Sequence, residues 1–122
     1  MKRAYVTMVS HGDTYLPGAQ ALGRSLDETG SHIPRIVMVT PDVSSPVLRE
    51  LAASGWDPHP VTPIANPHPD SQRLYPRFGA SFTKLRVFDL TEFERVVFLD
   101  ADTLVLRNID DLFDRPCLAA AP

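Results

Sequence analysis

The sequence contains a single cysteine, Cys117, so an intramolecular disulfide is excluded. No apolar run reaches membrane-spanning length, and the short run near the start is broken by polar residues before it reaches the length that a signal peptide needs. The four histidines lie at positions 11, 32, 59 and 68, without the spacing of metal ligands. The net charge of −3 argues against a protein that binds nucleic acid, because such proteins are normally basic. We therefore expect a cytoplasmic protein with no membrane span and no nucleic-acid partner.

The length and composition fit one globular domain. The chain has 122 residues, of which 43% are hydrophobic and 22% are charged, close to the values of an average soluble protein. The last six residues, "CLAAAP", are small and apolar, as in a strand that has been cut short. We therefore expect a fragment of a longer protein, in which residues 1–122 form a single, partial domain.

The first half of the sequence alternates between two kinds of pattern. Residues 4–9 and 35–40 are short apolar runs rich in β-branched residues, which predict buried strands. Residues 16–30 carry apolar side chains at the spacing of one helical face, and residues 44–55 combine a serine cap, an early proline and a final glycine, so both stretches predict helices. Strands that alternate with helices in this way predict an α/β fold with a mainly parallel sheet flanked by helices.

The second half begins with a proline-rich stretch. Six of the twelve prolines fall within residues 56–76, which predicts a long loop with room for only one short strand, near residues 56–61. Residues 80–93 fit a helix with one apolar face, formed by Phe82, Leu85, Phe88 and Leu90. In the run at residues 95–99, four apolar residues follow Arg95, which predicts a central strand that is buried on both faces.

Two aspartates directly follow this last strand. If the chain stays extended, Asp100 and Asp102 point the same way, with the small Ala101 between them. Ligands bind at the carboxyl ends of the strands in open α/β sheets, and paired carboxylates suit a hard cation such as Mn²⁺ or Mg²⁺. The alternative is that the two aspartates only end the strand as turn and cap residues. For Asp110, Asp111 and Asp114 we expect such a role, in a short helical turn.

Longer stretches of the chain resemble one enzyme family. The run "FLDADTLVLRNIDDLF" is similar to the Asp-x-Asp motif and its flanks in glycosyltransferase family 8, the glycogenin-like and galactinol synthase-like nucleotide-sugar transferases. The segment "SFTKLRVFDL" resembles the family segment that carries a lysine before this motif. The opening "AYVTMVSHGDTYLPGAQALGRSL" is similar to the family's first strand and helix. The resemblance covers most of the chain and implies a Rossmann-like GT-A fold that is truncated after the Asp-x-Asp region.

The resemblance also implies a function and a set of site residues. It implies a hexosyltransferase that binds a UDP-sugar through Mn²⁺ or Mg²⁺ and transfers the sugar, with retention, to a carbohydrate, polyol or protein acceptor. Asp100 and Asp102 are the implied metal ligands. The implied residues of the UDP-sugar site are Thr7, Met8, Ser10, Tyr15, Lys84, Asp100, Ala101 and Asp102. Judged without the resemblance, Lys84 is a solvated helix residue and Tyr15 a packing aromatic.

The match departs from the family in two places. Between Ser10 and Tyr15 the chain is one residue longer than glycogenin, so His11 and Gly12 do not map onto the family's base contacts. Family members also continue well beyond this length, with a histidine that completes the metal site. We therefore expect the donor-binding half of a transferase, inactive or weakly active alone, which leaves a second copy or a complementing chain as protein partners.

Three other classes of protein compete with this interpretation. The first is a nucleotide- or metal-binding module or subunit without catalysis. The second is a phospho-accepting regulatory domain, which needs an acidic pair after the first strand, whereas "SHGD" offers Asp13 alone. The third is a nucleotidyltransferase, for which "SHGDTYLPG" is a poor version of the glycine-rich basic loop.

Overall fold

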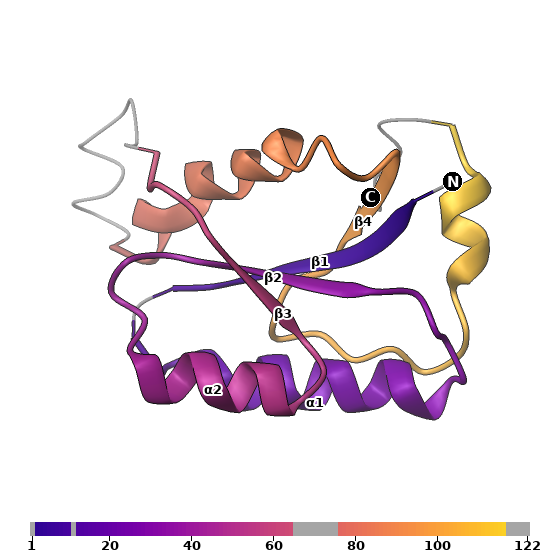
Figure 1. The fold of residues 1–122 in the computed structure, drawn as a ribbon, viewed down its shortest axis with the longest axis horizontal. Coiled ribbons are helices and arrows are strands. Elements are labelled where there is room, and N and C mark those ends of the chain that lie inside the picture. Colours follow the sequence, from indigo (N-terminus) through magenta and orange to yellow (C-terminus); the bar gives the residue numbers. More distant parts are fainter. Residues whose placement is uncertain (1, 11, 65–75, 117–122) are drawn as a thin grey trace.

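The computed structural model describes residues 2–10, 12–64 and 76–116. Figure 1 shows one sheet with helices on both sides. In chain order, the elements are β1 (Arg3–Val9), α1 (Leu16–Glu28), β2 (Arg35–Val39), α2 (Ser45–Ala53), β3 (Asp57–Pro60), the 3₁₀ helix η1 (Pro76–Asp89), β4 (Arg95–Phe98) and the 3₁₀ helix η2 (Asp110–Asp114). The predicted α/β fold with a parallel sheet flanked by helices is confirmed.

The four strands form one sheet in the order β3-β2-β1-β4, and every neighbouring pair is parallel. Val9 of β1 lies opposite Val39 of β2, and Val6 of β1 lies opposite Phe98 of β4. Because the strands are parallel, the segments that follow β1, β2 and β4 all leave the sheet at its carboxyl edge. This edge is where α/β folds place their ligands.

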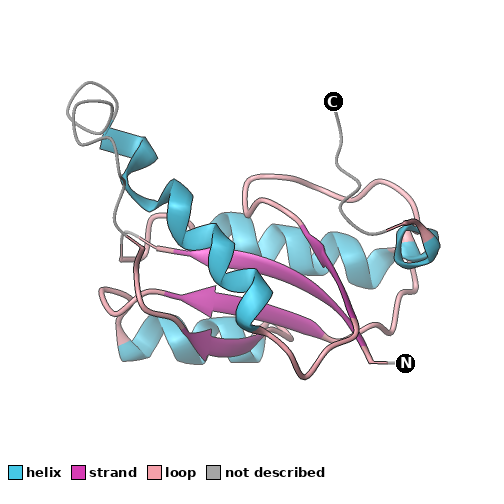
Figure 2. Ribbon diagram, turned by 90° about the horizontal axis from the view of Figure 1, so that it is seen from above, coloured by secondary structure: helices cyan, strands magenta, loops and turns pink. Residues whose placement is uncertain are grey.

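Alternation along β1 and β2 divides the core into two layers. Tyr5, Val9 and Val37 face α1 and α2, where they pack with Leu22 and the other buried residues of those helices. The intervening residues face the opposite side and form a smaller cluster that includes Val87 and Leu90 from η1 and the residue after it; its buried members are Ala4, Val6, Met8, Ile36 and Met38. Figure 2 shows the sheet between these helical layers.

The prediction that residues 95–99 form a central strand buried on both faces is wrong. β4 is the outermost strand of the sheet, and all four of its residues are only half-buried. Val97 packs against the layer of α1 and α2, and Val96 and Phe98 pack against the opposite cluster. Among the described residues, β4 pairs only with β1. An apolar run thus predicts the strand but not its position in the sheet, which depends on long-range pairing.

The proline-rich stretch contains the short strand that the sequence allows. Pro58 and Pro60 lie in β3, an edge strand, where a missing backbone donor interrupts no central ladder. Residues 65–75 of the predicted loop lie outside the described residues. The helix predicted at 80–93 occurs as η1, but its predicted apolar face is wrong: Leu85 and Phe88 are 52% and 64% exposed. A 3₁₀ helix has three residues per turn, so its buried face does not follow a 3.6-residue spacing.

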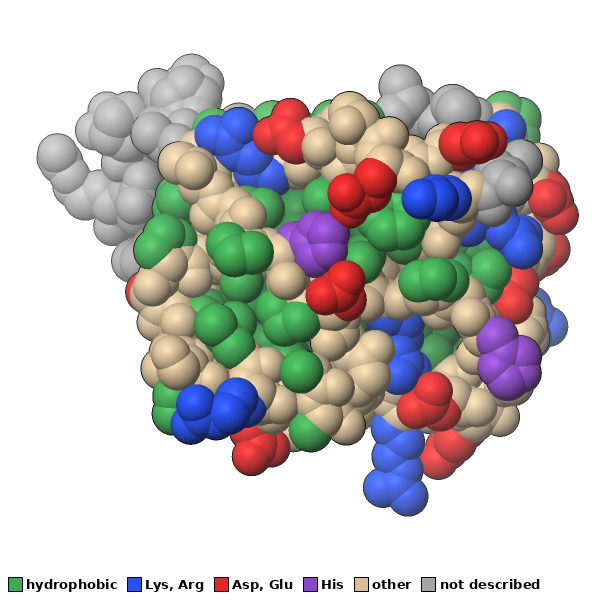
Figure 3. Space-filling model, in the orientation of Figure 1, with side chains coloured by type: hydrophobic (Ala, Val, Ile, Leu, Met, Phe, Trp, Pro, Cys, Tyr) green, Lys and Arg blue, Asp and Glu red, His purple; other side chains and the backbone are tan. Residues whose placement is uncertain are grey.

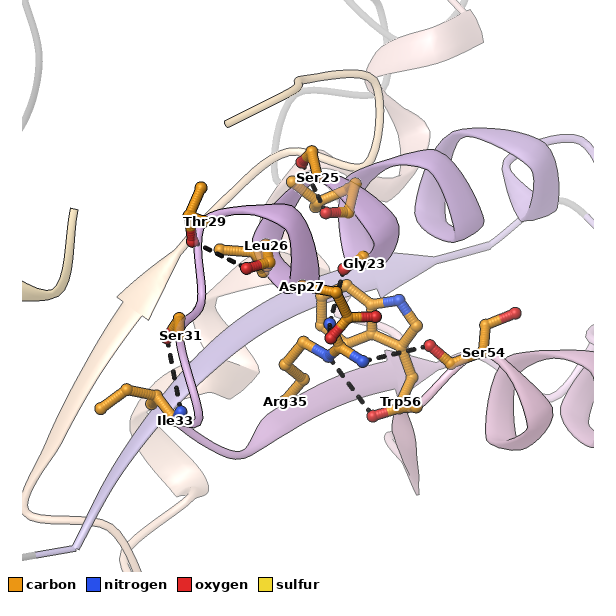
Figure 4. Close-up of polar contacts among 12 residues, drawn as sticks. Gly23, Ser25, Leu26, Asp27, Thr29, Ser31, Ile33, Arg35, Ser54 and Trp56 are labelled. Carbon is orange, nitrogen blue, oxygen red and sulfur yellow. Dashed lines mark hydrogen bonds and ion pairs between the residues drawn. The ribbon is translucent and has the colours of Figure 1, made fainter. Parts of the chain in front are cut away.

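Arg35, at the start of β2, connects α1 with the end of α2 (Figure 4). Its guanidinium donates hydrogen bonds to the Gly23 carbonyl at 2.6 Å, to the Asp27 carboxylate at 2.9 Å and to the Ser54 carbonyl at 3.2 Å. It also stacks on the buried Trp56 ring, 5.6 Å from the ring centre. This cluster lies at the amino edge of the sheet, opposite the carboxyl edge.

A second polar cluster fixes η2. The Tyr5 hydroxyl donates a 2.6 Å hydrogen bond to Asp110, and Ser31 donates another at 2.8 Å. Burial and the hydrogen bond to Asp110 raise the pKa of Tyr5 well above its ordinary value. Burial disfavours the charged form of Asp110, but the hydrogen bonds from Tyr5, Ser31 and Asn108 outweigh it and lower the Asp110 pKa. The predicted short helical turn is confirmed, whereas Asp110 is an anchored acceptor instead of a solvated cap.

Candidate functional site

The Asp-x-Asp segment forms a turn just beyond the carboxyl end of β4. Strand pairing ends at Phe98, and the Thr103 amide and hydroxyl both donate to the Asp100 carbonyl, at 3.1 Å and 2.6 Å. The expectation of an extended segment is therefore wrong. Ala101 is buried in the layer of α1 and α2, while Asp100 and Asp102 are both exposed. A buried alanine thus separates two carboxylates that face solvent.

Lys84 from η1 reaches this turn. Its ammonium lies 2.8 Å from Oδ1 of Asp100 and 5.8 Å from the ring centre of Phe98. The side chains of Lys84 and Asp100 are 45% and 52% exposed, so both remain accessible to a ligand. The structure therefore brings together four of the predicted site residues, Lys84 from η1 and the three residues 100–102 of the turn.

The predicted residues of the first strand and loop lie near the same edge but differ in exposure. Thr7 is fully buried beneath the helices, and Met8 is buried on the opposite face of the sheet. Ser10 is 5% exposed and Tyr15, just before α1, is 36% exposed. His11 lies outside the described residues. The predicted role of these residues at a uridine site stays a prediction.

Thr7 offers a direct test of its predicted role. Within the part of the chain that the structure describes, its buried hydroxyl has no hydrogen-bond partner. Replacing Thr7 by valine keeps the shape of the side chain and removes this hydroxyl. We therefore expect the free energy of unfolding, measured by urea titration, to rise by about 1 kcal/mol. If the hydroxyl contacts a nucleotide, the same variant would also bind UDP more weakly. A variant that is no more stable and binds UDP normally would contradict both effects.

The sequence patterns did not indicate one acidic residue at this edge. Asp42, after β2, accepts a 3.1 Å hydrogen bond from the Gly12 amide in the loop after β1, and the Thr40 hydroxyl donates to its other oxygen. Gly12 has a φ of +69°, which favours glycine. Asp42 thus ties the two loops that follow the central strands. The turn-type residues after the second strand, "TPD", were the available signal.

An apolar groove adjoins the Asp-x-Asp turn beside β4. Leu104 and Leu106 are 60% and 93% exposed. The groove is lined by Phe98, Leu99, Asp100, residues 103–107 and Ile109. Asp100 is the acidic residue in this lining, so an apolar surface and the candidate cation ligand adjoin each other.

The donor chemistry of the turn suits a hard cation, although the ligand set is small. Carboxylate oxygens are the ligands that Mn²⁺ and Mg²⁺ favour. Among residues 2–10, 12–64 and 76–116, no group of three or more His, Cys, Asp or Glu side chains could hold a metal ion. Asp100 and Asp102 therefore provide a fitting but partial set of ligands.

The surface and the helices show two further features. On the face in Figure 3, basic and acidic side chains are interspersed instead of forming a continuous basic surface. No helix within the described part of the chain is both long enough and apolar enough to cross a bilayer.

Comparison with known proteins identifies a matching family and several similar proteins. The family model described as glycosyl transferase family 8 matches residues 6–117. Inositol phosphorylceramide glucuronosyltransferase 1 of Arabidopsis thaliana is 41% identical over 92% of this chain and 20% of its own length. Human glycogenin-1 is 40% identical over 98% of this chain and 35% of its own length. Galactinol synthase 3 of Arabidopsis thaliana is 34% identical over 94% of this chain and 34% of its own length. The chain thus spans about a fifth to a third of the relatives that it matches.

Proposed function

This chain belongs to glycosyl transferase family 8, and on that premise we propose that it is the donor-binding part of a UDP-sugar-dependent hexosyltransferase with a GT-A fold. Asp100 and Asp102 would hold a divalent cation, Mn²⁺ or Mg²⁺. Thr7, Met8, Ser10, Tyr15 and Lys84 would contribute to the UDP-sugar site. The acceptor class and the retention of stereochemistry are part of the same proposal.

One observation supports the proposal above the others: the contact of 2.8 Å between Lys84 and Asp100 at the carboxyl edge of the sheet. A UDP-sugar carries a diphosphate. When the bond between the sugar and UDP breaks, negative charge develops on the departing UDP. When bound, a divalent cation neutralises this charge without a proton transfer. Lys84 adds a second positive charge beside the same carboxylate, and the exposed turn leaves both groups accessible to phosphate oxygens.

The proposal covers hexoses as a class, because the relatives are named for different sugars. One relative is named a glucuronosyltransferase and another a galactinol synthase. The small ligand set favours a second candidate function, a nucleotide- and metal-binding module without catalysis. The two candidates share the UDP site and differ in whether sugar is transferred.

We expect UDP to bind the purified chain in the presence of Mn²⁺ and at least about 100-fold more weakly after Asp100→Asn and Asp102→Asn are combined, because a neutral amide is a poor ligand for a hard cation. Isothermal titration calorimetry with and without Mn²⁺ measures this difference. Circular dichroism establishes that each variant is folded.

The matched control combines Asp111→Asn and Asp114→Asn, two exposed carboxylates around η2, which changes the net charge equally. It should bind UDP like the wild type. A folded wild-type chain that does not bind UDP with Mn²⁺ would overturn the donor site, and binding that survives in the first variant would overturn the role of the two carboxylates. If UDP binds, incubation with a UDP-sugar separates the two candidates. The enzyme would release free sugar or transfer it, and the non-catalytic module would do neither.

A further inference from the structure

The chain that follows the Asp-x-Asp turn is attached to α1 at successive points. The Val105 amide donates a 3.0 Å hydrogen bond to the Ser25 hydroxyl, which in turn donates to the Leu22 carbonyl at 2.7 Å. Farther along, the Asn108 amide group lies 3.4 Å from the Thr29 carbonyl. In Figure 1 this segment runs from β4 to η2 past the helix. The position of α1 therefore influences the position of the segment that begins with the turn.

The closest approach is at the turn itself. A Cβ atom added to Gly18 would lie 2.5 Å from the carbonyl oxygen of Ala101 and 3.8 Å from Cα of Asp102. Real Cβ atoms do not approach a backbone oxygen so closely, and a backbone group cannot rotate away as a flexible side chain can. Any side chain at position 18 therefore forces either α1 or the turn to move.

The packing indicates which of the two would move. Ala19, Leu22 and Leu26 are buried against the sheet, and the Trp56 indole donates a 2.9 Å hydrogen bond to the Ala19 carbonyl. In the turn, by contrast, Ala101 is the one buried residue, and Asp100, Asp102 and Thr103 are exposed. A clash would therefore displace the turn, because moving α1 would disrupt the buried core of the domain.

We propose that Gly18 is a positioning residue, which sets the place of the Asp100–Asp102 carboxylates by allowing α1 to contact the Ala101 backbone. This inference rests on the proposed function, since it assigns to α1 the alignment of the cation ligands. Gly18 has no side chain that could bind a cation or a nucleotide. Its effect passes through the Ala101 carbonyl, and Ser25 supports the same alignment from the next attachment point.

The test compares Gly18→Ala with Gly23→Ala. Gly23 lies in the same helix, and its added Cβ would meet the Trp56 indole nitrogen at 2.8 Å, so the same substitution there creates a clash with a side chain away from the turn. Two-dimensional ¹H–¹⁵N NMR spectra of both variants report which amides move. We expect Gly18→Ala to shift the amides of residues 101–103 most strongly and to weaken Mn²⁺-dependent UDP binding by about tenfold or more, given that small displacements of a site have large effects. Gly23→Ala should change this binding less than about threefold, as expected for a packing change outside the site.

The outcomes separate this inference from the proposed function. If the wild type fails to bind UDP, the proposed function fails, but the amide shifts still decide whether Gly18 positions the turn. Unchanged amides at 101–103 together with unchanged binding would overturn the inference. If Gly18→Ala does not fold, Ser25→Ala decides, because it removes the hydrogen bond to Val105 without a clash. Ser25→Ala should shift the same amides and weaken binding, and no change in either would contradict the positioning role.

Discussion

Replacement of Arg35 by alanine is expected to lower the free energy of unfolding by about 3 kcal/mol. The Arg35 side chain is only 11% exposed, and it donates to the Gly23 and Ser54 carbonyls and to the Asp27 carboxylate. Alanine would leave the carbonyls without their charged donor and would uncover the Trp56 ring on which the guanidinium stacks. Urea unfolding measured by fluorescence is the test, because Trp56 is the single tryptophan of the chain and is buried.

Arg24→Ala is the matched control for this experiment. Arg24 lies on the same helix that Arg35 contacts, but its side chain is 83% exposed and its ion pair with Glu28 is 3.5 Å long. Such a pair contributes about 0.5 kcal/mol or less. Arg35→Lys should fall between the two, because lysine keeps the charge but lacks the planar fork that reaches several acceptors. If Arg35→Ala were no more destabilising than Arg24→Ala, the cluster would not hold α1, β2 and α2 together. Since Arg35 lies at the amino edge of the sheet, folded Arg35→Lys should bind UDP normally.

Local patterns in the sequence predicted the elements whose stability is decided locally. The apolar spacing at Leu22 and Leu26 predicted α1, and the β-branched runs predicted β1 and β2, because each pattern matches the period of one kind of structure. The position of β4 at the sheet edge and the buried face of η1 depend on contacts between distant residues. Neither contact leaves a periodic signal, so both predictions failed there.

The same distinction between local patterns and distant contacts applies to the candidate site. The acidic pair after a predicted strand indicated Asp100 and Asp102 directly, whereas Lys84 was predicted only through the resemblance to the family. The sequence did not predict that Lys84 pairs with Asp100, 16 residues away. It also gave no sign of the contact between Gly18 and Ala101, since nothing in the local sequence links a helix glycine to a distant backbone oxygen. Pairings across the fold are set by tertiary structure, and they decide what the site residues can do.

Replacement of Lys84 by methionine is expected to change the binding of Mn²⁺ and of UDP in opposite directions. Without ligand, the ammonium neutralises Asp100 at 2.8 Å, so Mn²⁺ must compete with Lys84 for this carboxylate. Because both side chains are about half exposed, the pair contributes at most about 1 kcal/mol, so its removal should tighten binding of Mn²⁺ alone by up to about fivefold. UDP in saturating Mn²⁺ should bind about tenfold more weakly, since the proposed contact of Lys84 with the phosphates is lost.

The opposite changes in the two affinities distinguish a lysine that competes with Mn²⁺ from a general effect of net charge. Lys2 is the other lysine of the chain, and it lies next to β1 at the amino edge of the sheet, so Lys2→Met removes the same charge far from the turn. Electron paramagnetic resonance of free Mn²⁺ and calorimetry with UDP measure the two affinities separately. If Lys84→Met and Lys2→Met changed both affinities alike, Lys84 would act only through the net charge. If Lys84→Met weakened Mn²⁺ binding as well, the ammonium would orient Asp100 for the cation instead of occupying its place, and the competition would be refuted. Tighter Mn²⁺ binding combined with weaker UDP binding requires one lysine that neutralises the carboxylate in the free protein and moves to the diphosphate in the complex.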